Sequence, residues 1–154
     1  MKVFISSLNV PIGYATPPFP SLYWPLGPEK ANFQASFLYY SADMWRFIVW
    51  WSMLTFGGLY LITGTLAGLI QLRNRYRQCK IDKTSILEAL GIVVFYVFVG
   101  LFQGFVGGCI VGLLLSGIYK AGALTMSTWI PFCWAIISVL FDVCSSYSLS
   151  SVIL

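Results

Sequence analysis

Three stretches of the chain are almost entirely apolar, and shorter polar stretches separate them. They cover about residues 45–72, 86–119 and 127–147. About 20 apolar residues in a helix are enough to cross the hydrocarbon core of a bilayer, so each stretch is long enough to span it. The pattern predicts an all-α membrane protein with three transmembrane helices.

The second apolar stretch is the longest of the three. As a continuous helix, Ser85 to Tyr119 would be about 50 Å long at 1.5 Å per residue, which is too short for two spans and a turn. We therefore expect one tilted or bent helix. Its first turns, which contain Glu88, should extend into the cytosolic interface, where Glu88 can reach headgroup water or Lys83.

The polar stretch between the first two spans is basic. It holds five of the nine basic residues of the chain against one acid. Short loops rich in Lys and Arg stay in the cytosol, so with three spans the N-terminus should be lumenal and the C-terminus cytosolic. The loop should also contact anionic lipid headgroups. Its basic residues are Arg73, Arg75, Arg77, Lys80 and Lys83.

Composition agrees with a membrane protein and excludes several functions. The chain is 58% hydrophobic and 9% charged, whereas soluble domains are about 25% charged. Most of its net charge of +4 lies in the basic loop, so we expect membrane lipids as partners and no nucleic acid. The chain has no His and no paired Cys spacing, which argues against metal sites, cofactors and catalysis. We expect no enzyme and no disulfides, and Cys79 is more readily a free thiol than a palmitoylation site.

Residues 1–44 form a segment of different character, ahead of a transmembrane domain over residues 45–154. The segment holds six of the seven prolines, which favour extended or turned backbone, and many aromatic rings, which favour the membrane interface. We expect a short interfacial helix over Ala31–Tyr40. Two interpretations stay open: a lumenal segment resting on lipid, or a surface that docks a partner. The candidate docking residues are Tyr14, Phe19, Tyr23, Trp24, Phe33, Phe37 and Trp45.

Glycines recur at intervals of four in the second span and offer the most specific packing signal. Residues four apart share one helix face, and small residues there let another helix approach closely. The pattern, a glycine zipper, predicts tight packing of the first two spans. Packing within the chain is the favoured interpretation, and contact with another protein or another copy is the alternative. The glycines are Gly57, Gly64 and Gly68 in the first span and Gly100, Gly104, Gly108 and Gly112 in the second.

The spans resemble the transmembrane protein 170 family over about residues 43–135. The resemblance rests on Asp43–Trp45, Leu66–Leu69, Gly117–Ala121 and Ile130–Phe132, in this order. It implies a small three-span protein of the endoplasmic reticulum and nuclear envelope, in a family associated with membrane shaping. One departure is that none of the asparagines before or just after the first span begins a glycosylation sequon.

Two functions are compatible with these features. The first is a non-enzymatic accessory or scaffold subunit of the endoplasmic reticulum membrane, which supports lipid transfer or membrane shaping. A large membrane protein, such as a bridge-like lipid-transfer protein, is a candidate partner. The alternative is a self-contained lipid scramblase or transporter, which needs a polar route through the spans. Its only materials are Gln103, Thr63, Thr65 and Asp142, and we favour Asp142 as the cytosolic end of the third span.

Overall fold

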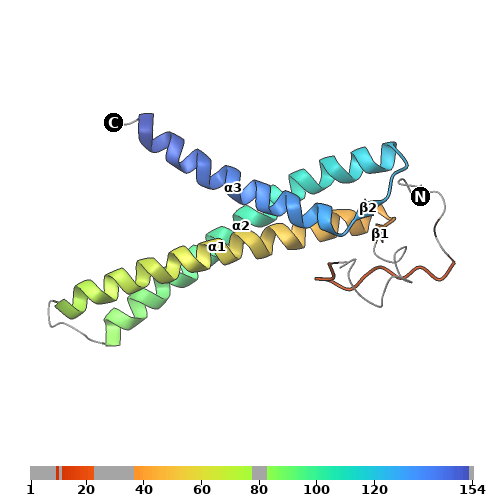
Figure 1. Cartoon of the computed structure of the whole chain (residues 1–154). Coiled ribbons are helices and arrows are strands. Elements are labelled where there is room, and N and C mark those ends of the chain that lie inside the picture. The colour runs from red at the N-terminus through yellow and green to blue at the C-terminus, as the bar shows by residue number, and fades with distance from the viewer. Residues whose placement is uncertain (1–9, 11, 23–36, 78–82, 153–154) are drawn as a thin grey trace. The chain divides into compact units, whose positions relative to one another are not determined.

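Three long helices and two very short strands make up the part of the chain that the structure describes. A computed structural model (Figure 1) describes residues 10, 12–22, 37–77 and 83–152. All three helices are long and apolar enough to cross a membrane, which confirms the predicted all-α, three-span membrane protein. In chain order the elements are β1 (Phe37–Leu38), α1 (Ser41–Arg77), α2 (Lys83–Ala121), β2 (Met126–Ser127) and α3 (Trp129–Val152).

The helices extend beyond the apolar stretches that predicted them. α1 has 37 residues and continues to Arg77, through the basic residues that follow the apolar stretch. Cations suit the negative end of the helix dipole, so this last turn is electrostatically favourable. α2 is one helix of 39 residues, about 58 Å long at 1.5 Å per residue. That length exceeds the roughly 30 Å hydrocarbon core, so α2 must tilt or reach into the interfaces.

The structure divides into two compact units whose boundary passes through α1 and α2. One unit consists of Met1–Ser52 with Gly107–Leu154, and the other of Met53–Val106. We call them the strand unit, because it contains β1 and β2, and the hairpin unit, because it contains the stretches of α1 and α2 on either side of their connection.

In the strand unit, β1 and β2 form an antiparallel pair, and β2 is followed directly by α3 (Figure 1). Phe37 pairs with Ser127, and Leu38 pairs with Met126. The helix expected over Ala31–Tyr40 is therefore wrong at Phe37–Leu38, and residues 31–36 lie outside the described residues. The aromatic spacing matched a helix, but pairing with a distant strand satisfies the same backbone groups, and such a tertiary contact overrides local preference.

The core of the strand unit lies beside this strand pair. Leu38 and Met126 are fully buried, and so is Ile48 on the first turns of α1. Phe132 and Ile130 at the start of α3 pack against the same cluster. The core thereby joins the beginning of α1, the strand pair and the beginning of α3. Its buried members are Leu38, Met44, Phe47, Ile48, Trp51, Met126 and Ala135.

The hairpin unit has apolar outer faces. Leu69 on α1 and Phe98 on α2 are 63% and 67% exposed. In water such surface would be unfavourable, whereas in a bilayer it contacts lipid tails of the same polarity. The exposure is thus what a membrane-spanning pair of helices requires.

Candidate functional site

Four glycines let α1 and α2 approach closely in the hairpin unit. A Cβ atom added at Gly100 would lie 2.5 Å from Tyr60 Cβ, and one added at Gly64 would lie 2.9 Å from Tyr96 Cβ. Both distances are shorter than carbon atoms can adopt without a shift. The corresponding distances are 3.0 Å at Gly57, to Leu101, and 3.3 Å at Gly68, to the carbonyl of Ala89. These positions are therefore filled by the facing helix.

Of the other glycines of the row, Gly108 and Gly112 lie in the strand unit and Gly104 lies in the hairpin unit. A Cβ at Gly108 would lie 2.9 Å from Ser52 Cβ, and one at Gly112 would lie 2.9 Å from Trp45 Cδ1. Gly104 is buried. The contacts favour the interpretation that the glycines pack helices of the same chain. A partner helix could use these faces only by displacing α1.

Gln103, a strongly polar residue inside the second span, forms a hydrogen bond within the hairpin unit. The hydroxyl of Tyr60 donates a hydrogen bond to Gln103 Oε1 at 2.7 Å. The Thr63 hydroxyl donates to the carbonyls of Leu59 and Tyr60, and the Thr65 hydroxyl donates to that of Ile62. These groups satisfy one another or their own helix instead of lining an open polar route.

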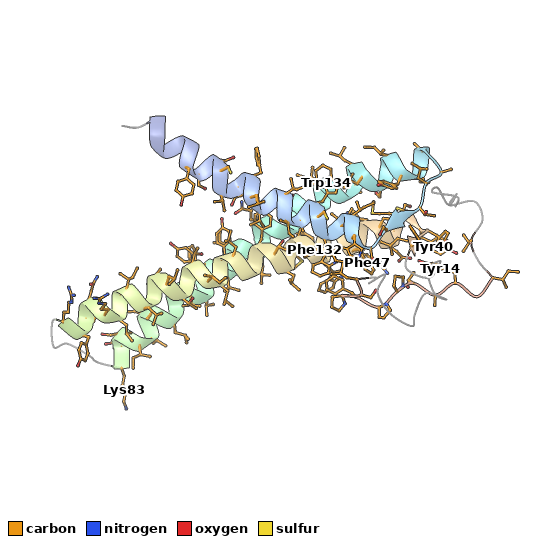
Figure 2. The ribbon with its side chains drawn as sticks, in the orientation of Figure 1. Tyr14, Tyr40, Phe47, Lys83, Phe132 and Trp134 are labelled. Atoms are coloured by element: carbon orange, nitrogen blue, oxygen red, sulfur yellow. The ribbon has the colours of Figure 1, made fainter. Side chains whose placement is uncertain are left out.

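Within the strand unit, Tyr14 packs against β1 and the residues that follow it. Its hydroxyl donates a 2.9 Å hydrogen bond to the carbonyl of Phe37, and its ring centroid lies 4.7 Å from that of Tyr39. Figure 2 shows Tyr14 beside Tyr40, where the ring centroids are 6.1 Å apart. Burial raises the pKa of Tyr14 to about 12, because the ionised phenolate would lose hydration there. Burial also raises the pKa of Tyr39.

Phe19 connects the residues before β1 to α1. Its ring packs against those of Phe47, Trp50 and Trp51, with centroids 5.8, 6.0 and 5.2 Å away. Several of the predicted docking residues thus contact the chain itself: Tyr14, Phe19, Phe37 in β1, and Trp45 against Gly112. The remaining three, Tyr23, Trp24 and Phe33, lie outside the described residues.

The basic end of α1 carries an ion pair and a cavity. Arg75 Nη2 lies 3.2 Å from Glu88 Oε2, and Gln71 Nε2 donates to the same oxygen at 3.4 Å. Glu88 therefore pairs with Arg75, where the sequence offered Lys83, and its side chain stays 50% exposed. The sequence contained both charges, but only the antiparallel packing of the helices brings them together. Lys83 extends away from the start of α2 (Figure 2), and Lys80 lies outside the described residues.

A cavity of about 440 Å³ opens along this end of α1. Its described lining residues are spaced to lie on one helical face: Ala67, Ile70, Gln71, Asn74 and Arg75. Arg73 and Arg77 are exposed and do not belong to this lining, whereas Arg75 is half-buried. The sequence predicted a uniformly basic loop and did not separate these three arginines.

Metal-binding groups are not assembled in the described part of the chain. There, no cluster of three or more His, Cys, Asp or Glu side chains could hold an ion. Cys109, Cys133 and Cys144 are free thiols, and Cys79 lies outside the described residues. The arrangement offers lipid-facing surface, engaged polar groups and a basic interfacial cavity.

These features define an integral membrane protein with three spanning helices. A family model described as Transmembrane protein 170A/B-like matches residues 37–154, so the chain belongs to this family and the resemblance over residues 43–135 is confirmed. The match extends from β1 through the whole of α3. The chain is also similar to the Uncharacterized protein YPR153W of Saccharomyces cerevisiae, with 38% identity over 149 residues, covering 97% of this chain and 96% of the relative. The search of solved structures found no match.

Proposed function

We propose that this chain is a non-enzymatic accessory or scaffold subunit of the endoplasmic reticulum membrane, supporting lipid transfer or membrane shaping. The observation that carries the proposal is the use of polar groups within the spans. Gln103 is hydrogen-bonded to Tyr60, and the two threonine hydroxyls bond to their own helix. A molecule whose polar groups stabilise helix packing, and whose outer faces are apolar, is suited to holding a position in lipid.

The same contacts disfavour a solitary scramblase or transporter. A headgroup crossing the bilayer needs polar groups that can exchange partners with it, because an unsatisfied polar group in hydrocarbon costs several kcal/mol. Here such an exchange would break the Tyr60–Gln103 bond that joins the two helices. This alternative is tested by reconstitution of the purified chain in liposomes, where lipid movement abolished by Asp142→Asn would favour it.

The basic end of α1 supports the proposed orientation, since Arg73, Arg75 and Arg77 lie in its last turns. Lys- and Arg-rich ends stay cytosolic, so the N-terminus is assigned to the lumen and the C-terminus to the cytosol. The endoplasmic reticulum, and the nuclear envelope continuous with it, is the compartment that the family resemblance implies.

The proposed partner is a larger membrane protein, with a bridge-like lipid-transfer protein as the leading candidate. The glycine faces are filled within the chain, so the partner contact is assigned to exposed aromatic residues of the strand unit. Trp50 is 56% exposed and touches the Phe19 ring, and Tyr40 is 53% exposed and touches the Tyr14 ring. Rigid aromatic anchors of this kind carry much of the binding free energy at protein interfaces.

The test is purification of the tagged chain in mild detergent, followed by mass spectrometry of bound proteins. We expect one very large partner at constant stoichiometry, lost from a Trp50→Ala, Tyr40→Ala variant. A Leu113→Ala variant, altered at a residue that is 64% exposed on α2, is the matched control and should retain it. Recovery of the chain alone, from membranes that contain the candidate partner, would contradict the accessory role.

A further inference from the structure

The cavity at the end of α1 changes from apolar to polar along its length. Ala67 and Ile70 line the part nearer the middle of the span, and Asn74 and Arg75 line the part nearer the helix end. From Ile70 to Arg75 the helix rises about 7.5 Å at 1.5 Å per residue. Each interfacial layer of a bilayer is about 5–7.5 Å thick, half the difference between the total and hydrocarbon thicknesses. The change in polarity therefore matches one lipid interface.

The polar part of the cavity holds a cation that is paired with a carboxylate. Arg75 is half-buried, and Glu88, which itself accepts from Gln71, holds one nitrogen of its guanidinium at 3.2 Å. A guanidinium carries five N–H donors in a planar fork, and among the described residues only Glu88 contacts that of Arg75, which leaves donors able to bind a phosphate diester. The exposed Arg73 and Arg77 add positive charge around the opening, which favours an anionic ligand.

We propose that this cavity seats one anionic phospholipid. Its phosphate accepts hydrogen bonds from Arg75 and Asn74, and the first carbons of an acyl chain lie against Ile70 and Ala67. Glu88 is a positioning residue that orients Arg75. The cavity is open along one face of α1, where Ile70 is 61% exposed, so a lipid can enter it from the side. The proposal does not depend on the accessory role, since a chain without a protein partner would keep the same cavity.

The experiment counts lipids that stay bound to the full-length chain. Protein is reconstituted in phosphatidylcholine vesicles that contain phosphatidylserine, extracted in mild detergent and measured by native mass spectrometry. Arg75→Gln should lower retained phosphatidylserine about tenfold, because a hydrogen bond to a charged group is lost. Arg73→Gln and Arg77→Gln remove the same charge outside the cavity lining. They should lower retention by less, as expected for diffuse attraction to the membrane surface.

Asn74→Ala distinguishes specific binding in the cavity from diffuse attraction to surface charge, because it leaves the net charge unchanged. We expect it to lower retention about tenfold, because the lost hydrogen bond goes to a charged phosphate. Ala67→Phe should block the apolar part and lower retention as well. The thermal midpoint of Arg75→Gln in detergent would reveal whether this variant folds. If it does not fold, Asn74→Ala and Ala67→Phe still test the proposal.

Two results would overturn the proposal. Equal losses from the three arginine variants, together with full retention in Asn74→Ala, would show that the basic end attracts lipid only diffusely. Displacement of phosphatidylserine by millimolar inorganic phosphate would show that the cavity recognises free phosphate. We expect inorganic phosphate to leave the lipid in place, since it makes no contact with Ile70 or Ala67.

Discussion

At the scale of single residues, the glycines of α2 differ in what surrounds them. Gly100 faces the Tyr60 side chain, whereas a Cβ added at Gly107 would meet nothing within 4 Å. Glycine lowers helix stability relative to alanine by about 1 kcal/mol. At Gly100 close packing against the facing helix compensates for that cost, and at Gly107 no described contact does so.

Gly100→Ala should therefore destabilise the chain, by about 1–3 kcal/mol, the usual cost of overpacking. Gly107→Ala, the matched control, should be neutral or stabilise it by up to about 1 kcal/mol. The measurement is thermal unfolding in detergent, monitored by circular dichroism. Equal effects of the two substitutions would show that the close approach of Tyr60 to Gly100 is wrong.

The contact of Tyr14 with β1 should weaken at high pH. The pKa of Tyr14 in the folded chain is about 12, above the usual 10.0. Its contribution to folding stability is therefore complete below pH 10 and is lost as the pH rises towards 12. An absorbance titration of the tyrosines should contain a late component near pH 12 that Tyr14→Phe removes. Tyr40→Phe is a control on the neighbouring ring, and loss of the same component from that variant would assign it to the wrong tyrosine.

The sequence was sufficient for properties that depend on neighbours along the helix. Apolar length predicted the three spans, and spacing by four predicted the face that carries Gly100 and Gly108. It was insufficient where the partner is remote in the chain. The pairing of Phe37 with Ser127 and of Arg75 with Glu88 depends on how the helices pack, and neither residue type nor local spacing encodes it.

At the scale of elements, a hydrogen bond between side chains inside the spans joins α1 to α2 in the hairpin unit. Tyr60 donates to Gln103 across 43 positions of sequence. Hydrogen bonds between membrane helices contribute about 0.6 kcal/mol on average and about 1.7 at most. The bond is thus a modest addition to glycine packing, and its main effect is to select one alignment of the helices.

A double-mutant cycle with Tyr60→Phe and Gln103→Leu should measure a coupling free energy of about 0.6–1.7 kcal/mol. Each single substitution leaves the other group without this partner, so the two losses should add to more than the loss in the double variant. Unfolding in a denaturing detergent provides the free energies. A coupling near zero would indicate that the two side chains do not interact in the bilayer.

The strand pair contributes buried side chains to the core of the strand unit. Met126 is fully buried and packs in the core with Leu38. Met126→Ala should destabilise the chain by about 2–5 kcal/mol, as for other large-to-small core substitutions. Leu113→Ala, at a residue that is 64% exposed, should change stability much less. Thermal midpoints in detergent compare the two, and a similar effect of both would place Met126 outside a packed core.

At the scale of the whole molecule, the proposed orientation in the membrane rests on the arginines at the end of α1. Arg73, Arg75 and Arg77 occupy its last turns, and three spans follow from the three helices. In sealed microsomes a tag at the N-terminus should resist added protease, and a tag at the C-terminus should be digested. Detergent should expose both tags. Digestion of the N-terminal tag in sealed vesicles would reverse the proposed orientation.

The packing of the hairpin unit also limits how this chain can vary in length. The partners of Gly57, Gly64 and Gly68 on α2 occur in the opposite order along the sequence, as Leu101, Tyr96 and Ala89. Insertion or deletion of one residue between Gly57 and Gly64 would rotate the following turns by about 100° and turn the later glycines away from their partners. Relatives that keep this packing should therefore carry their length differences outside these helical stretches.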